Sequence, residues 1–156
     1  MAISITIKDN SKQIDKNFKS IVSKFPRIID QGIKQAGFQL LEFIKTKTKR
    51  GIDFNDKPFA PYSERYLKQL SEEGKPTNVD LFYSGRMLGS LTPDSFKKTG
   101  KHKITLGFSR AEERTKALFN QVLRNPIREF FGFNTKTENI IKKQFHKFIS
   151  QEINKI

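Results

Sequence analysis

Apolar residues in the first third of the chain recur at helical spacing. They are Ile14, Phe18, Ile21, Val22 and Phe25, followed by Ile29, Ile33, Ala36, Leu40, Phe43 and Ile44. Steps of three and four positions place such residues in one stripe along a helix. Ser11 is a suitable N-cap, and Pro26 interrupts the first helix or starts a new one. The cations in residues 45–50 (KTKTKR), followed by Gly51, are typical of a helix C-terminus. We therefore expect a helix from Ser11 and a long helix over 27–50.

The C-terminal part carries a second helical stripe, formed by Ile141, Phe145, Phe148, Ile149 and Ile153. Thr135 and Glu138 precede this stripe with the spacing of a capping box, in which each side chain bonds to the backbone of the other residue. The pattern predicts a final helix that begins at Thr135.

Two short segments alternate between apolar and polar residues, which is typical of half-buried strands. They are residues 3–7 (ISITI) and residues 102–108 (HKITLGF). We expect one strand in each segment.

The middle of the chain is dominated by a long loop. Residues 52–80 are rich in Pro, Asp, Asn, Gly and Glu, and 64–70 within them are compatible with a short helix. Loops of this length are usually functional or ordered by a partner. Beyond the loop, apolar spacing predicts a short helix within 82–91 and helical or mixed structure over 112–122.

Length and composition indicate a single domain spanning residues 1–156, because the chain is too short for a second independent core. Only 35% of the residues are apolar, but fifteen are Phe, so we expect an aromatic-rich core. Cysteine is absent, which excludes disulfides and cysteine-based metal sites. The longest uncharged runs have seven residues, far below the roughly 20 of a membrane span. We expect no membrane segment and a location in the cytoplasm after synthesis.

The charge is unevenly distributed along the chain. The net charge is +14, with +7 in residues 8–50, −2 in residues 51–94 and +9 in residues 95–156. Two basic flanks thus enclose a slightly acidic middle. This balance favours a polyanionic neighbour such as nucleic acid, and equally favours charge-matched contact between copies of the chain.

Three basic clusters are candidates for nucleic-acid contact. The clusters are Lys45, Lys47, Lys49 and Arg50; Lys97, Lys98, Lys101 and Lys103; and Lys142, Lys143 and Lys147. Without a recognised nucleic-acid-binding motif, they would bind the phosphate backbone irrespective of sequence. The other interpretation is that each cluster is a solvated face.

The sequence contains no motif that predicts catalysis, a cofactor or a metal. His102 and His146, the only two imidazoles, lie in different segments without the neighbours of a general base. Asp53 and Asp56 could suggest a divalent cation, but aspartates in such loops more often form Asx turns. We therefore assign no catalytic, cofactor-binding or metal-binding residue.

Four segments, taken in order, carry a resemblance to a known family. They are DFNDKPFAPYSERYL (53–67), LFYSGRMLGSL (81–91), ALFNQ (117–121) and NPIREFFGFN (125–134). Together they resemble the virion morphogenesis proteins of tailed bacteriophages, the Mu-type tail-completion family. That family has a long N-terminal helix, a G-x-P-W-x-P-L-S loop, L-x-x-S-G-x-L-x-x-S, a strand, Y-A-x-x-H-Q-x-G, P-A-R-x-F-L-G and a final helix.

The second and fourth segments match this series well. The first has Phe59 in place of the usual Trp. The third has Asn120 where His is common and lacks the following Gly. The resemblance covers roughly residues 27–155.

The resemblance implies a small α+β fold, in which a long N-terminal helix and a C-terminal helix pack on a small, mainly antiparallel sheet with a long central loop. It also implies a structural protein of the virion neck or tail top, similar to tail-terminator and head–tail joining proteins. Such a protein is not an enzyme. It would assemble as a homo-oligomeric ring, with a hexamer expected from tail symmetry, among other neck and tail proteins.

Four residues are candidate contacts with a neighbouring subunit or partner, namely Phe59, Tyr62, Arg86 and Arg128. In the second segment, Leu81, Phe82, Met87, Leu88 and Leu91 can pack inward while Arg86 is presented on a surface. Arg86 would suit a carboxylate across a subunit interface. Alternatively, Ser84 caps a helix and Arg86 is merely solvated. For Arg128, enclosed by aromatic residues, we favour a structural role within the fold.

A second function class stays open. The chain could be a stand-alone basic protein that binds nucleic acid without sequence preference. A small hydrolase or nuclease has little support, because no base, nucleophile or metal cluster can be named.

Overall fold

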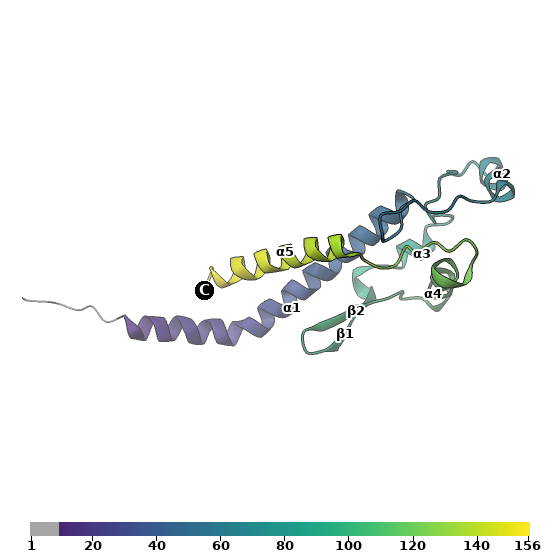
Figure 1. Cartoon of the computed structure of the whole chain (residues 1–156). Helices are drawn as coiled ribbons and strands as arrows, with labels where there is room; N and C mark the ends of the chain where they lie inside the picture. Colours follow the sequence, from purple (N-terminus) through teal and green to yellow (C-terminus); the bar gives the residue numbers. More distant parts are fainter. Residues whose placement is uncertain (1–9) are drawn as a thin grey trace, which may run out of the picture.

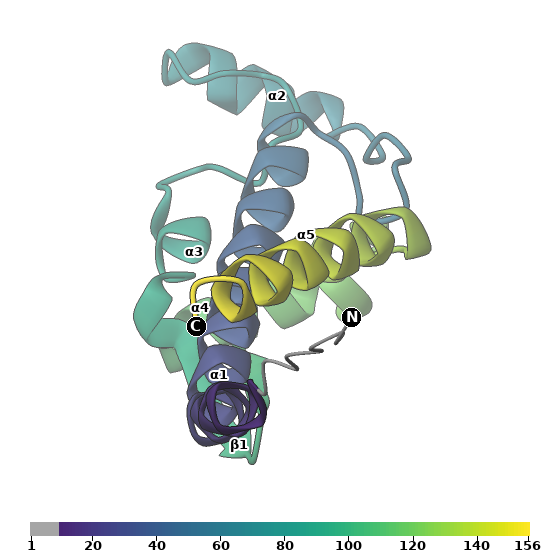
Figure 2. The same ribbon diagram turned by 90° about the vertical axis from the view of Figure 1, so that its left-hand side faces the viewer.

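Two long antiparallel helices form the frame of the molecule. The computed structural model describes residues 10–156. Helix α1 (Ser11–Lys49) and helix α5 (Thr135–Ile153) pack against each other (Figure 1). The view along α1 shows α5 on one side of this helix and α3 on the other (Figure 2). The strand predicted over 3–7 lies outside the described residues.

Helix α1 is continuous, which corrects the expectation of a break at Pro26. Pro26 is exposed, so water can solvate the carbonyl that loses its hydrogen bond four residues earlier. The N-cap is Asn10 and not Ser11, whereas Gly51 adopts the predicted left-handed conformation after the helix, with φ of 73°. Among the described residues, neither α1 nor any other helix is long and apolar enough to cross a bilayer.

Two buried glycines bring other elements close to α1. A Cβ on Gly32 would lie 2.8 Å from the ring of Phe145 on α5. A Cβ on Gly37 would lie 2.7 Å from Phe96 and 2.8 Å from Ile104, which belong to the hairpin. The absence of side chains at these positions therefore allows α5 and the hairpin to approach the α1 surface.

The sheet is a two-stranded antiparallel hairpin. Strand β1 (Phe96–Gly100) pairs with strand β2 (Lys103–Leu106), with Phe96 opposite Leu106. The strand predicted over 102–108 is confirmed, and its partner β1 was not predicted. The α+β class with long N-terminal and C-terminal helices is confirmed.

Five short helices complete the regular secondary structure of the described residues. They are α2 (Glu64–Glu72), α3 (Arg86–Gly89), the 3-10 helix η1 (Pro93–Ser95), α4 (Ala111–Leu118) and the π-helix η2 (Phe119–Leu123). The predicted short helices near 64–70, within 82–91 and over 112–122 are confirmed.

Two predicted helix caps are corrected by the structure. Helix α3 begins after Gly85, whose φ of 70° suits glycine, and Ser84 makes no cap. Helix α5 is capped by Asn134, whose side chain accepts a hydrogen bond from Thr137 N at 2.9 Å. Helix α5 therefore begins at Thr135 as predicted, but its cap is Asn134 and not the predicted capping box of Thr135 and Glu138.

The core lies where the C-terminal half of α1 meets α3, α4 and the loops. Its buried members are Leu41, Ile44, Phe59, Met87, Leu88, Leu91, Ala117 and Phe130. Two of these eight residues are Phe, and Phe96, Phe108 and Phe131 pack against them, so the expectation of an aromatic-rich core is confirmed in part. Several other Phe residues are at least 40% exposed, namely Phe18, Phe25, Phe38, Phe82, Phe119 and Phe133.

Candidate functional site

The four segments that carry the family resemblance meet at one end of the molecule. The first and fourth are joined through Arg128, which is buried. Its Nε donates to the carbonyl of Ala60 at 3.0 Å and its Nη2 to that of Pro61 at 2.8 Å. The guanidinium also lies over the ring of Tyr62, 5.0 Å from its centre. Burial lowers the pKa of Arg128.

The third and fourth segments are joined through Gln121. Its side chain donates to the carbonyl of Phe131 at 3.2 Å and accepts from the N–H of the same residue at 3.0 Å. Arg128 N donates to Asn120 O at 2.8 Å in the same region. A glutamine amide that pairs with both backbone groups of one residue fixes the relative position of the two segments.

The first segment also contacts the fourth and second segments along its length. Phe54 N donates to Glu129 O at 3.0 Å. The hydroxyl of Tyr62 accepts a hydrogen bond from Leu81 N at 3.2 Å. Residues 52–63 are therefore held by contacts within the chain. This corrects the expectation that a partner is required to order the whole of loop 52–80.

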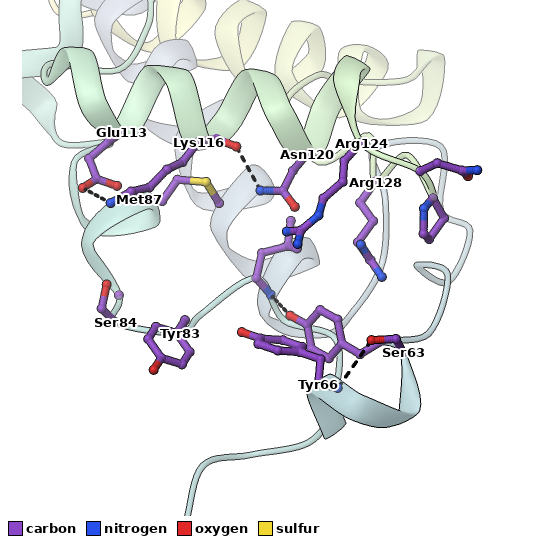
Figure 3. A pocket seen from close by; sticks show the side chains of 15 residues that line it. Ser63, Tyr66, Tyr83, Ser84, Met87, Glu113, Lys116, Asn120, Arg124 and Arg128 are labelled. Atoms are coloured by element: carbon purple, nitrogen blue, oxygen red, sulfur yellow. Dashed lines mark hydrogen bonds and ion pairs between the residues drawn. The ribbon is translucent and has the colours of Figure 1, made fainter. Parts of the chain in front are cut away.

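A cleft of about 360 Å³ lies between α2, residues 81–85 and the α4–η2 helix (Figure 3). Its lining includes three tyrosines and three cations, namely Tyr62, Tyr66, Tyr83, Lys116, Arg124 and Arg128. The rings of Tyr62 and Tyr66 meet edge to face at 4.9 Å between centres. Burial is the main reason that the pKa values of both hydroxyls are raised.

Glu113 lies at the opposite end of the cleft from Arg124 (Figure 3). Its side chain is buried, and Oε1 accepts from Lys116 Nζ at 3.0 Å. Among the described residues, its buried Oε2 has no hydrogen-bond partner. Tyrosine rings and guanidinium groups beside a carboxylate form a surface suited to recognising polar and aromatic groups of another molecule. Across residues 10–156, no group of three His, Asp or Glu residues could hold a metal ion.

The second segment presents Arg86 at the surface, while Met87, Leu88 and Leu91 are buried as predicted. Phe82 departs from the prediction, because its side chain is exposed and not part of the core. Its ring instead lies against Gly85, where an added Cβ would come within 2.7 Å of it.

Of the four predicted contact residues, two are buried and two are accessible. Phe59 and Arg128 are buried, which corrects the expectation that their side chains meet a partner and supports the structural role favoured for Arg128. Tyr62 lines the cleft and Arg86 is exposed, so both are open to further contacts.

Three members of the basic clusters, one in each cluster, form ion pairs within the chain. Lys47 lies 2.8 Å from Asp56 and also donates to Phe54 O and Thr137 Oγ1. Hydrogen bonds from Lys47 and Asn134 lower the pKa of Asp56. These contacts correct the assignment of Lys47 to nucleic-acid binding.

In the hairpin cluster, Lys98 lies 2.8 Å from Asp30, which also contacts His102 Nδ1 at 2.9 Å. Hydrogen bonds from Lys98 and His102 lower the pKa of Asp30. The Lys98 side chain is nevertheless 62% exposed, so its assignment to nucleic-acid contact stays a prediction. The exposed cations of the first two clusters are Lys49, Arg50, Lys97, Lys98, Lys101 and Lys103, while Lys45 is half-buried. In the third cluster, Lys142 pairs with Glu138, and Lys143 and Lys147 are exposed.

Sequence reasoning missed Glu113, Lys116 and Arg124 as members of a site. Helical spacing could have placed Glu113 and Lys116 on one face of α4, since they are three residues apart. No sequence pattern linked them to Tyr62 or Tyr66, about fifty residues earlier in the chain. Comparison of the chain with protein-family models, curated proteins and solved structures finds no match.

Proposed function

We propose that this chain is a structural subunit of a phage virion, which completes the tail or joins the tail to the head as a ring of identical copies. The observation that carries the proposal is the convergence of the four resembling segments. They are separated along the sequence, yet Arg128, Gln121 and Tyr62 link them into one unit. The four segments are therefore parts of one structural unit, which supports the proposal.

In this function the converged segments form the base of the subunit, and exposed side chains on this base and on the parts that project from it make the contacts. Helix α2 stands away from the paired helices α1 and α5 (Figure 1). Tyr62 and Arg86 are the accessible members of the predicted contact set. The ring would work by surface complementarity with its neighbours, with six copies matching the symmetry of a tail. Exposed basic surface would face the path of the genome.

The mass of the purified protein in solution tests this proposal. Light scattering should detect a ring-sized species in the absence of DNA, because the proposed contacts are between protein subunits. A protein that stays monomeric alone, and whose mass changes only when a nonspecific DNA duplex is added, would contradict it.

Arg86 offers a more local test of the same function. Arg86→Ala should impair assembly and leave the unfolding transition near that of the wild type, because this exposed side chain belongs to no described core contact. Deletion of the whole loop 52–80 is a poorer test. It would remove Phe59 from the core and the two carbonyls that Arg128 contacts.

A second candidate function is binding of nucleic acid by the monomer. The observation that favours it is the set of exposed cations at the hairpin, Lys97, Lys101 and Lys103, together with the net charge of +14. This function predicts sequence-independent duplex binding whose affinity falls steeply as salt rises. Replacing the three lysines by Gln should then weaken binding and reduce its salt dependence.

A further inference from the structure

The N-terminal half of α1 presents an apolar stripe to solvent. The α1 stripe consists of Ile14, Phe18, Ile21, Val22 and Phe25, which fall on one side of the helix. Four of these side chains are between 40% and 64% exposed, and Ile21 is half-buried. Figure 1 shows this half of α1 extending past the C-terminal end of α5.

The α1 stripe continues the face of α1 that α5 covers. Ile14, Ile21 and the buried Ile28 are spaced seven residues apart, and so are Phe18, Phe25 and Gly32. Gly32 is the point at which Phe145 and Ile149 of α5 approach α1. A steady seven-residue spacing is the pattern that keeps one seam of a helix against a partner helix. The uncovered stripe is therefore the continuation of a helix-packing interface.

A second exposed apolar surface lies on another element. The η2 patch consists of Leu118, Phe119, Val122 and Leu123, which are between 49% and 60% exposed. Their spacing places them on one face of the helix that runs from α4 into η2. In Figure 1, α4 lies at the end of the molecule opposite to the N-terminus of α1. The α1 stripe therefore cannot cover the η2 patch of the same chain.

The two surfaces are comparable in size. Each exposes roughly 400 Å² of apolar surface, given the area that such side chains bury when covered. A standard interface buries about 800 Å² on each partner, of which a little over half is non-polar. Each surface thus has about the apolar area that one side of a stable interface requires.

Charge decides which surfaces pair. Residues 11–27 carry five cations and one carboxylate, namely Lys12, Lys16, Lys19, Lys24, Arg27 and Asp15. Pairing two α1 stripes would bring two such basic helices together and cost free energy through repulsion. The exposed charges close to the η2 patch are more evenly mixed, with Glu112 and Glu129 among Arg114, Lys116 and Arg124. The η2 patch is therefore a better binding surface for the α1 stripe than a second α1 stripe is.

We propose that the α1 stripe of one copy of this chain docks on the η2 patch of the next copy. Two different surfaces at opposite ends of one subunit make a head-to-tail contact, which closes into a ring when the rotation between copies permits. The inference rests on the proposed function, because it names the interface between the subunits of that ring.

Two variants and their mixture test this interface by light scattering. Phe18→Asp alters the stripe and Val122→Asp alters the patch, and each variant alone should be monomeric. Mixed in equal amounts, they should form pairs but nothing larger, because the intact patch of the first variant still receives the intact stripe of the second. The apparent dissociation constant of each variant for itself should rise roughly tenfold or more.

Ser23→Asp and Asn139→Asp are the matched controls, since both add one negative charge at exposed helical positions away from the two surfaces. They should assemble as the wild type does. An assembling wild type together with an assembling Val122→Asp variant would overturn this interface and leave the proposed function standing. A monomeric wild type would overturn both. Binding of wild type, but not of Phe18→Asp, to vesicles of anionic phospholipid with no self-association would assign the stripe to a membrane surface instead.

Discussion

At the residue scale, Arg128 shows how a buried cation can be accommodated without a carboxylate. Its two hydrogen bonds end on the carbonyls of Ala60 and Pro61, and the ring of Tyr62 covers one face of the guanidinium. Arginine suits this role because its donors form a fixed planar fork. The sequence context PIREFFGF indicated a structural arginine, but its partners lie about seventy residues away.

Arg128→Ala should lower the free energy of unfolding by about 2–4 kcal/mol, because it leaves two carbonyls without their donor and removes buried packing. Arg128→Lys should recover only part of this loss, since an ammonium group cannot reproduce the fork. Urea denaturation measures both changes. Equal stability of Arg128→Ala and wild type would show that the contacts of Arg128 contribute nothing to the stability of the fold.

Glu73 should make stability depend on pH in the acid range. Hydrogen bonds from Lys75, Gln69 and Tyr83 lower the pKa of its carboxyl from 4.5 to about 2. A lowered pKa in the folded state stabilises the fold above the unfolded value, and this contribution is lost as pH falls from about 4.5 toward 2. Wild type should therefore unfold at a higher temperature than Glu73→Gln near neutral pH.

This difference in unfolding temperature should shrink as the pH is lowered through that window. A set of thermal scans across the acid range measures it, and an NMR titration of the Glu73 carboxyl gives the pKa directly. A constant difference between wild type and Glu73→Gln at every pH would contradict the assignment.

At the element scale, glycines determine how closely other elements pack on α1. Glycine normally weakens a helix interior by about 1 kcal/mol relative to alanine. At Gly32 and Gly37 this cost is offset by close contact with α5 and the hairpin. Of the apolar stripe predicted over 29–44, only Ile44 is buried, and the other members are half-buried. The prediction omitted both glycines, because they contribute no apolar side chain.

Gly37→Ala should destabilise the protein in spite of its better helix propensity. The added Cβ would meet both Phe96 and Ile104, and overpacking of this kind costs about 1–3 kcal/mol. Gly89→Ala on α3 is the matched control, because nothing lies within 4 Å of its Cβ position. Denaturation should show a loss for Gly37→Ala of up to about 2 kcal/mol and little change for Gly89→Ala. A stabilised Gly37→Ala would mean that the hairpin packs less tightly than described.

At the scale of the whole molecule, a net charge of +14 opposes association while the exposed apolar surfaces favour it. Subunits of like charge repel each other, and salt screens this repulsion over about 10 Å at 0.1 M. Apolar contacts persist in salt. The salt dependence of self-association therefore reports which of the two effects dominates.

Self-association should strengthen as salt is raised from low to moderate concentration, whereas binding of duplex DNA should weaken over the same range. Sedimentation at several salt concentrations, with and without a duplex, measures both trends. Self-association that weakened with salt would indicate contacts between opposite charges, as between the acidic middle and the basic flanks, and would count against an interface driven by apolar surface.

The sequence by itself determined the long terminal helices, one hairpin strand and the short helices, because these depend on the local spacing of apolar residues. It did not predict that α1 continues across Pro26, where an exposed proline is tolerated. It also did not predict β1, because residues Phe96–Gly100 do not alternate between apolar and polar side chains. A local pattern identifies a helix or a strand, but it does not show which face of that element is covered by other parts of the protein.

Only the tertiary structure decided which side chains form the site and which stay exposed. Lys47 and Lys98 belong to basic runs in sequence, yet folding brings Asp56 and Asp30 to them. The α1 stripe has the pattern of a buried face, but α5 ends before it can cover the stripe. Burial depends on contacts between residues far apart in the chain. The apolar pattern of a helix is the same whether its apolar face packs against the same molecule or against another one.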